Sequence, residues 1–546
     1  MKTIKSLVLG SAAGLLAVGG AQAADLPVKA KAVEYVRICS LYGAGFFYIP
    51  GTDTCIKLGG YLRADLALAT NTDYDGRVAS VGGANNRYTN YYTARARQSI
   101  DIDTRTATEY GVVRTFATMV FSWTDGSYSG NPANPGATVY QALGGAGTVS
   151  PASAPQNANP GTVGGGSLGL YNAYIQFAGF TIGRAVSQFS APWVNYPGFQ
   201  NFDGLPGGGG AVTGVNQFTY TTQFGNGVSA TLSAQDQVVY YTSGIANLNS
   251  SIAAANLVSG TFGASDIAGT RSPDLVASVK IDQAWGLFQL SAAAHENHAG
   301  YYTIPGAGAV SISGTEAAGH PGDKWGWAVQ GALQIKNIPT GPGDTIMIQG
   351  VYTEGASRYN FQDLMTTSFA MFGGTGIPGA YQSVGFGFVT DSVFVTGGEQ
   401  QLTKTYGFRG GYTHNWDPYW SSSVYGGWAA VRYNDNAKAA FCAGPGVGGF
   451  TGIGALISTG VAGCNPDFNY SAVGLITRWT PVKNLAFSAD LTYVMLDQKF
   501  AAGSTFTCGS TTGTAACSVG IGKPGAVYEL KDQNALQIAL RAQRNF

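Results

Sequence analysis

The last fifteen residues, Asp532-Gln-Asn-Ala-Leu-Gln-Ile-Ala-Leu-Arg-Ala-Gln-Arg-Asn-Phe546, alternate between apolar and polar side chains. Leu536 and Ile538 fall on one face, whereas Arg541 and Gln543 fall on the other. An alternation with a period of two predicts a β-strand with one apolar and one polar face. A strand that ends the chain leaves an edge in an open sheet, but in a closed barrel it pairs with the first strand. The stretch therefore predicts barrel closure, although an ordinary surface strand would show the same pattern.

The composition favours a barrel that spans a membrane. Charged residues make up 11% of the 546 residues, against roughly 25% in typical soluble proteins. Glycine is abundant at 80 residues, and aromatic residues make up 12%. Beyond the N-terminal region there is no apolar run of about 18 residues that could form a transmembrane helix. Alternating strands keep the mean hydropathy near zero, so these values are typical of a transmembrane β-barrel.

Residues 1–23 have the features of a secretory signal peptide. Lys2 and Lys5 give a positive start, Leu7–Val18 forms a short apolar core, and Ala21-Gln22-Ala23 is a small-x-small cleavage site. We expect this segment to be removed during export. Basic and acidic residues are equal in number, 30 of each, which gives no reason to expect a nucleic-acid partner.

The alternating pattern recurs along the rest of the sequence. Because about 9–11 residues cross a bilayer as a tilted strand, we expect residues 55–546 to form a single antiparallel barrel. Residues 24–54 should form a periplasmic lead-in with a short strand at Tyr35–Ile38. We predict sixteen barrel strands, at 56–68, 92–103, 109–122, 169–178, 180–186, 214–224, 228–240, 273–283, 287–296, 324–336, 344–352, 403–414, 420–433, 467–480, 485–499 and 532–546.

Short and long connections alternate between these strands. Bacterial outer-membrane barrels have short periplasmic turns and long external loops, so we expect the barrel to lie in outer-membrane lipid in that orientation. The short turns are near 104–108, 179, 225–227, 284–286, 337–343, 415–419 and 481–484. The long loops are near 69–91, 123–168, 187–213, 241–272, 297–323, 353–402, 434–466 and 500–526.

Aromatic residues cluster where the predicted strands meet their connections. Two such groups are expected, because amphipathic rings prefer the interfaces of a membrane. At the short-turn end they are Phe180, Phe224, Trp285, Trp416, Trp420, Trp479 and Phe546. Toward the long-loop end they are Tyr92, Trp123, Tyr240, Trp325, Tyr352 and Tyr433.

Six cysteines lie outside the predicted strands: Cys39, Cys55, Cys442, Cys464, Cys508 and Cys517. An exported protein meets an oxidising compartment, so we expect disulfides. Pairing neighbours in sequence would join residues 39 with 55, 442 with 464 and 508 with 517, but other connectivities stay open. The spacings do not match those of a zinc site.

Several stretches resemble the general porins of alphaproteobacteria, of the rhizobial and Brucella type. The resemblance is carried by Cys39–Arg63, which begins Cys-Ser-Leu-Tyr-Gly-Ala-Gly-Phe-Phe-Tyr, and by Arg95–Gly111, Ala173–Arg184 and the terminal Phe546. It implies a trimeric, sixteen-stranded, water-filled channel through which small hydrophilic solutes and ions diffuse passively.

The same resemblance implies details of assembly and of the pore. It supports a bridge between Cys39 and Cys55. It implies that the third external loop, at about 187–213, folds inward and narrows the channel. The terminal Phe546 resembles the signal that the barrel-assembly machinery reads.

Basic residues on the first three strands fall at positions expected to face the lumen. Since neighbouring strands lie about 4.8 Å apart, these side chains could form one basic wall that biases which ions pass. They are Lys57, Arg63, Arg95, Arg97 and Arg114. Alternatively, the nearby acids Asp65, Asp101 and Asp103 pair with them and flatten the field. The loop at 187–213 carries one acid, Asp203, so we predict weak selectivity that leans toward anions.

Aromatic residues of the same loop allow two interpretations. Phe189, Trp193, Tyr196 and Phe199 either wedge the loop against the wall, which we favour, or form a slide for sugars.

The sequence predicts no enzyme, no metal site and no cofactor. His295 and His298 are three residues apart at a strand end, whereas the zincin motif needs a spacing of four on a helix. Two matches to G-x-G-x-x-G, at 374–379 and 444–449, lie in glycine-rich loops and contain proline. Besides a diffusion channel, the sequence leaves open a substrate-specific channel and a surface adhesin or receptor barrel.

Overall fold

The computed structural model places most of the residues that follow the predicted signal peptide. The expected signal peptide and residues 24–36 of the lead-in lie outside the described residues, as does Asp203. The structure describes residues 37–69, 86, 92–124, 167–193, 205–208, 214–236, 243–248, 252–259, 266–303, 314–361, 368–443, 451–509, 516–518 and 522–546.

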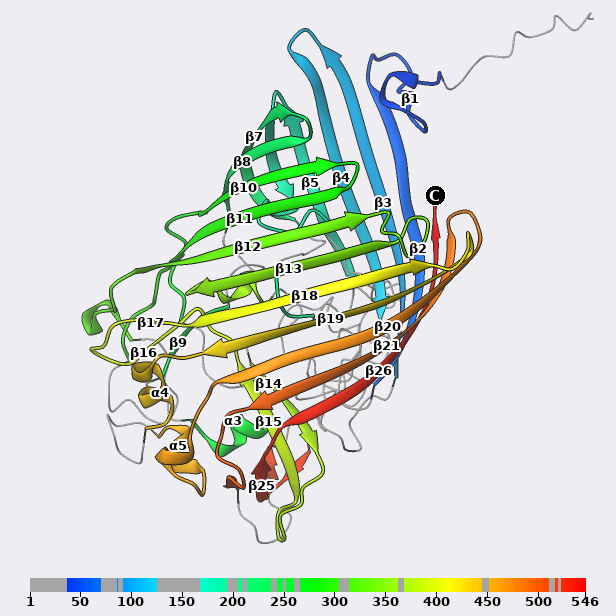
Figure 1. The fold of residues 1–546 in the computed structure, drawn as a ribbon. Coiled ribbons are helices and arrows are strands. Elements are labelled where there is room, and N and C mark those ends of the chain that lie inside the picture. The colour runs from blue at the N-terminus through cyan, green and yellow to red at the C-terminus, as the bar shows by residue number, and fades with distance from the viewer. Residues whose placement is uncertain are drawn as a thin grey trace, which may run out of the picture.

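Sixteen strands of the described residues form a closed antiparallel barrel, as predicted. Each pairs with its neighbour along the chain, and the last strand pairs with the first. Figure 1 shows the C-terminal strand beside β2. The strands are β2 (Cys55–Ala69), β3 (Tyr92–Thr108), β4 (Gly111–Thr124), β5 (Ser167–Phe177), β6 (Phe180–Ala185), β7 (Val215–Gly225), β8 (Val228–Gln235), β10 (Asp274–Gln283), β11 (Gly286–Asn297), β12 (Lys324–Lys336), β13 (Thr345–Glu354), β18 (Lys404–Asn415), β19 (Trp420–Arg432), β20 (Phe468–Val482), β21 (Leu485–Gln498) and β26 (Gln533–Asn545).

The two faces of each strand carry different side chains, as their period of two requires. On β12, Trp325, Trp327 and Val329 are exposed on the outer surface, whereas Gln330 is 1% exposed on the inner face. On β26, Leu536 faces outward, and Gln537 is buried inside. The outer belt is therefore apolar, and the interior holds polar groups that pack against inward-folded segments.

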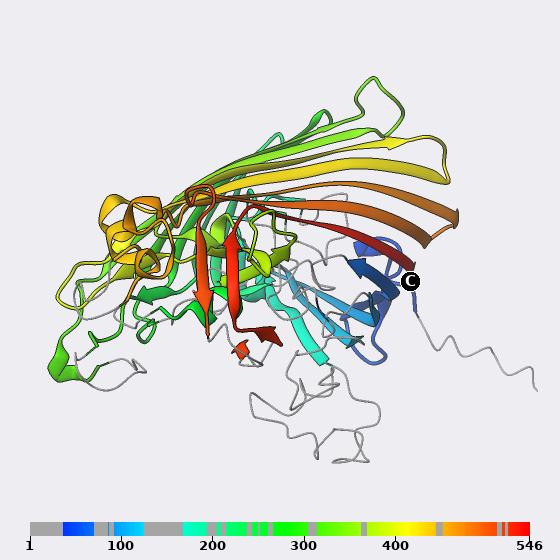
Figure 2. The same ribbon diagram turned by 90° about the horizontal axis from the view of Figure 1, so that it is seen from below.

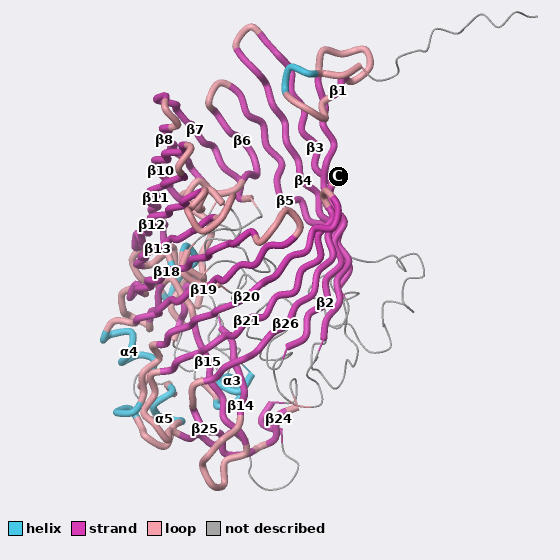
Figure 3. The backbone as a smooth tube through the Cα atoms, turned by 45° about the vertical axis from the view of Figure 1, so that its right-hand side comes forward, coloured by secondary structure: helices cyan, strands magenta, loops and turns pink. Residues whose placement is uncertain are grey.

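The short and long connections lie at opposite ends of the barrel. The turns at Asn226 and Asn484 have positive φ angles of 49° and 67°, and asparagine tolerates this left-handed geometry in tight turns better than most residues. The helices α4 (Asp435–Phe441) and α5 (Ile453–Leu456) lie with the long loops (Figures 2 and 3).

A small disulfide-linked segment, residues 37–54, precedes the barrel at its short-turn end, and we call it the N-terminal segment. The strand β1 (Phe47–Tyr48) pairs with the start of β2, and η1 (Ser40–Tyr42) precedes it. Cys39 and Cys55 are joined by a disulfide. Of the strand predicted at Tyr35–Ile38, the described part forms only a single bridge, from Ile38 to Phe47.

The long loops contain structure of their own, which the sequence did not predict. A small sheet joins β14 (Ser368–Gly373), β15 (Gln382–Phe388), β25 (Ala526–Leu530) and β22 (Thr505–Cys508). The remaining short elements are β9 (Ile245–Asn247), β16 (Ser392–Phe394), β17 (Gln401–Leu402), β23 (Ala516–Ser518), β24 (Lys523–Pro524), α3 (Ala254–Ser259), η6 (Glu316–Ala318), η7 (Ser357–Tyr359) and η9 (Val461–Gly463).

Two further disulfides hold these loops. One joins Cys442 to Cys464, and the other joins Cys508 to Cys517. With the disulfide between Cys39 and Cys55, all six cysteines thus pair with their neighbours in sequence. Three of them lie within strands, since Cys55 opens β2, Cys508 ends β22 and Cys517 lies in β23.

Aromatic side chains lie exposed on the outer surface at both ends of the strands. Trp285, Trp420 and Trp479 are exposed near the short turns, and Trp325 near the long loops. The prediction for Tyr433 is wrong, because this side chain is 4% exposed. Its hydroxyl donates to the carbonyl of Phe388, so the ring anchors a long loop.

Candidate functional site

The basic residues predicted to face the lumen lie on the inner face of β2, β3 and β4. Strand register places Arg63 directly opposite Arg97, and Asp65 opposite Arg95. Directly paired residues of neighbouring strands point to the same face of a sheet. Because Asp65 is buried and Leu62, on the other face of β2, is exposed to the outside, the face of Asp65 is the interior. The structure therefore gathers these arginines on one stretch of inner wall.

Acidic residues neutralise part of this wall. Asp65 accepts from Arg95 Nη2 at 3.0 Å and from Arg541 Nε at 2.6 Å. Asp103 accepts from Arg105 and Arg114, each at 3.0 Å. Each carboxylate is thus shared by two arginines, so this group retains an excess of positive charge.

Other basic residues on the wall have neutral or aromatic neighbours. Arg63 Nε donates to Gln543 Oε1 at 2.8 Å, and its guanidinium lies 4.3 Å from the centre of the Tyr61 ring. Arg97 Nε donates to Ser122 Oγ at 2.9 Å. Sequence reasoning missed Arg105, although it shares the odd-numbered face of β3 with Arg95 and Arg97.

Lys57 is separate from the rest of the wall. Its ammonium lies 5.8 Å from the ring centre of Phe46 in the N-terminal segment. Its register partner is Asp103. Lys57 therefore lies at the short-turn mouth of the barrel, closer to the short turns than Arg63.

The segment after β6 folds into the barrel, as predicted for the third long loop. Phe189 is fully buried and contacts the ring of Tyr359, with ring centres 4.5 Å apart. This contact supports a wedge rather than a slide for Phe189. Trp193 packs against the main apolar cluster. Tyr196 and Phe199 lie outside the described residues.

Glutamines from successive wall strands hold this segment by its backbone. Gln330 of β12 donates to the carbonyl of Phe189 at 2.8 Å. Gln289 of β11 donates to the carbonyl of Ser190 at 2.9 Å. Gln349 of β13 donates to the side-chain oxygen of Gln330 at 2.8 Å, which orients that amide.

Two more glutamines continue the row toward β6. Gln217 of β7 donates to the carbonyls of Ala185 and Val186 at 2.7 and 3.1 Å. Gln235 of β8 accepts from Ser187 Oγ at 2.7 Å. We call Gln217, Gln235, Gln289, Gln330 and Gln349 the glutamine row. Amides suit this role because one side chain supplies both a donor and an acceptor to an extended backbone.

Further along the same loop, residues 205–208 reach β18, the wall strand beside β13. Arg409 of β18 donates to the carbonyl of Leu205 at 3.3 Å. Gly207 has a φ of 102°, and a Cβ there would lie 2.3 Å from the backbone of Phe408. Only glycine combines this conformation with so close an approach. The loop segments thus lie along the inner wall from β7 to β18.

A second inward structure occupies the long-loop end of the interior. Phe369 of β14 packs edge-on against Phe468 and Tyr470 on the inner face of β20. Small inward residues make room for it, among them Ala472 and Ala539. The β14–β15 hairpin therefore fills part of the mouth beside β20, β21 and β26.

Two observations concern other classes of site. In the described part of the protein, no cluster of three His, Cys, Asp or Glu residues could hold a metal ion. None of the described helices has both the length and the apolar character needed to cross a membrane.

Comparison with known proteins identifies relatives of this chain. A family model described as "Porin subfamily" matches residues 25–539. Porin Omp2b of Brucella suis biovar 1 is 34% identical over 244 residues, which cover 42% of this chain and 54% of that protein. Porin Omp2a of Brucella ovis is 35% identical over 238 residues, or 42% of this chain and 59% of that protein. The matched region thus spans little more than half the length of these relatives.

Among solved structures, the outer membrane channel DcaP of Acinetobacter baumannii is similar to this protein with a TM-score of 0.49. The two are 14% identical in sequence, and the match covers 91% of this chain and 99% of that one.

Proposed function

Because the chain belongs to the porin subfamily, we propose that it forms a water-filled channel for passive diffusion of small hydrophilic solutes and ions. The family and the closed barrel place the protein in the outer membrane. The observation that carries the proposal is the polar inner wall with an inward-folded segment tied across it by the glutamine row. This arrangement narrows a barrel while its wall stays hydrophilic, as diffusion of solutes requires.

The basic wall is our candidate for the selectivity element. In this proposal Lys57, Arg63, Arg95, Arg97 and Arg114 line the pore, and Asp203 is the facing acid. Since Asp65 and Asp103 offset part of the charge, the expected preference for anions is weak. A reversal potential measured across a KCl gradient tests the sign, and a clear preference for cations would contradict it.

Several expectations about assembly belong to the same proposal. Residues 1–23 would act as the signal peptide, and residues 24–54 as the periplasmic lead-in before the barrel at 55–546. The constriction loop would extend over about 187–213. The working form would be a homotrimer in outer-membrane lipid, folded by the barrel-assembly machinery. Planar-bilayer recordings of the purified protein test this, because three pores per particle would close in triplets.

Liposome swelling separates the proposal from a substrate-specific channel. A diffusion channel admits sugars in order of their size, whereas a specific channel saturates with one solute. A surface adhesin or receptor barrel would show no steps of conductance in a bilayer, and that result would remove the proposal.

A further inference from the structure

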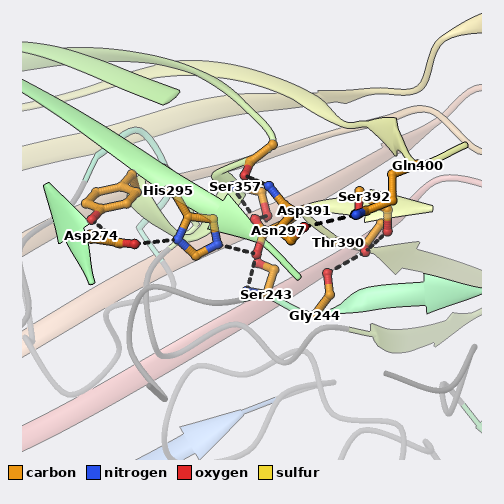
Figure 4. Close-up of polar contacts among 12 residues, drawn as sticks. Ser243, Gly244, Asp274, His295, Asn297, Ser357, Thr390, Asp391, Ser392 and Gln400 are labelled. Carbon is orange, nitrogen blue, oxygen red and sulfur yellow. Dashed lines mark hydrogen bonds and ion pairs between the residues drawn. The ribbon is translucent and has the colours of Figure 1, made fainter. Parts of the chain in front are cut away.

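His295 lies between two buried carboxylates on the inner face of β11. Its Nδ1 is 2.8 Å from Asp274 Oδ1 on β10, and its Nε2 is 3.7 Å from Asp391 Oδ2 in the connection after β15. The side chains of all three are at most 2% exposed. Figure 4 shows the ring between the two acids. Since both ring nitrogens face carboxylates, the site favours the imidazole that carries a proton on each nitrogen and is positively charged.

The other groups around the ring are polar donors to the same carboxylates. Tyr359 donates its hydroxyl to Asp274 Oδ2 at 2.5 Å. The backbone NH and hydroxyl of Ser357 donate to Asp391 Oδ1 at 2.6 and 2.8 Å. The backbone NH of Ser243 donates to Asp391 Oδ2 at 2.7 Å (Figure 4). The bond from Tyr359 joins wall strand β10 to the connection after β13, whereas the serine bonds join Asp391 to its own connection and to the one that carries Ser243.

The charges of this cluster depend on His295. Within the described residues, it is the one positive group that forms an ion pair with Asp274 or Asp391. The next acid along β11, Glu296, has its own cation in Arg271, at 3.8 Å. Without the proton on His295, two buried carboxylates would face a neutral ring. Such an arrangement is costly in a low-dielectric interior.

The segment that carries Ser357 and Tyr359 also contacts two parts of the inward-folded loop. Tyr359 contacts the ring of Phe189, with centres 4.5 Å apart. The neighbouring Asn360 accepts from the backbone NH of Gly207, through its side chain at 3.1 Å and its carbonyl at 3.2 Å. The segment 357–361 therefore lies between His295 and two separate parts of the inward loop.

We propose that His295 is a positioning residue for the constriction: its charge holds segment 357–361 against the wall, and alkaline pH releases that segment. Tyr359 and Asn360 then no longer brace Phe189 and Gly207, and the inward loop gains freedom. The direction of the pH effect follows from the charges. The ion pairs of His295 with Asp274 and Asp391 are present while His295 is protonated and are lost as the pH rises. The inference rests on the proposed channel function.

Bilayer conductance of the full-length protein tests this with the pH varied from about 6 to about 10 on the long-loop side. We expect current fluctuations of the wild type to become about tenfold more frequent over this range. His295→Gln should fluctuate at the high rate at every pH. His295→Lys keeps a positive charge over most of the range and should stay quiet until the most alkaline values. His320→Gln alters a histidine whose Nδ1 lies 2.9 Å from the carbonyl of the adjacent Pro321, and this variant should behave as the wild type.

Two results would overturn the proposal: a wild type without pH dependence, or a His295→Lys variant with the full transition of the wild type. Because His295→Lys retains the charge, it carries the test if His295→Gln does not fold. Hydrogen exchange of residues 186–191, normalised at each pH to an unstructured peptide, reads the same release without conduction. A protein that does not conduct but shows pH-dependent exchange would refute the channel and keep the positioning role. Exchange independent of pH in a conducting protein would refute the positioning role alone.

Discussion

Arg541 Nε lies 2.6 Å from Asp65 Oδ1, so an ion pair joins the last strand of the barrel to the first. The two residues are direct register partners on β26 and β2. The other oxygen of Asp65 accepts from Arg95 on β3 at 3.0 Å. One carboxylate thus connects three adjacent strands across the seam that closes the barrel.

Asp65→Asn should weaken this seam and strengthen the preference for anions. Removal of one partner from a buried ion pair costs about 3–5 kcal/mol, and Arg95 and Arg541 would both lose their shared carboxylate. The temperature at which the folded band disappears in semi-native gels measures stability, and the reversal potential measures selectivity. Asp53→Asn, at an exposed position of the N-terminal segment, is the control. An unchanged reversal potential would argue against a pore-lining role of this wall.

Gln330→Met should loosen the inward segment and raise the conductance. The carbonyl of Phe189 would lose its buried donor, and an unsatisfied buried polar group costs about 1–3 kcal/mol. Single-channel conductance checks the expectation. Gln334→Met is the matched control, because Gln334 lies on the same face of β12 but closer to the short turn, where it is half-buried. Equal conductance of both variants and the wild type would mean that the glutamine row does not set the constriction.

Deletion of Phe546 should reduce insertion more than it alters conductance. The backbone NH of Phe546 donates to the carbonyl of Gly60 at 3.1 Å, but its ring is 63% exposed and contributes little to the interior. The amount of protein in isolated outer membranes and the conductance of the purified variant separate the two effects. Phe546→Tyr should insert normally. Wild-type levels of the deletion variant would contradict a role of the terminal ring in assembly.

Lys523→Met should stabilise the long-loop end near neutral pH. Burial lowers the pKa of Lys523 from 10.5 to about 7, although its ammonium lies 4.0 Å from the ring centre of Phe372. Between these values the unfolded protein binds more protons than the folded one, so stability of this region rises with pH. Limited proteolysis of the loops at about pH 6 and about pH 9 measures this slope. The slope should vanish in Lys523→Met and persist in Lys531→Met, which alters an exposed lysine.

The pH dependence at Lys523 has the opposite sign to that proposed for His295. Alkaline pH removes a charge that has only partial compensation at Lys523, but at His295 it removes the charge that two carboxylates require. A rise in pH should therefore slow proteolysis of the outer loops and at the same time make current fluctuations more frequent.

Much of the fold could be predicted because barrel strands carry a local signal. Side chains at alternate positions meet lipid and lumen, so strands such as β12 and β26 are legible from period alone. The same period assigned Arg63, Arg95 and Arg97 to the inner face. It did not identify β14 and β15, because their residues are buried on both faces within a long connection and show no clean alternation.

The sequence by itself determined the sixteen strands, their closure through Asp532–Phe546 and the inward direction of the basic residues, because each depends on a pattern within one segment. Only the tertiary structure decided which inward side chains meet. The glutamine row comes from five strands, and its convergence on one loop segment depends on the stagger of the barrel, which period does not encode. His295 meets Asp391 through a connection that folds back into the interior. Contacts between segments far apart in the sequence depend on how loops fill the lumen, and local alternation carries no information about that.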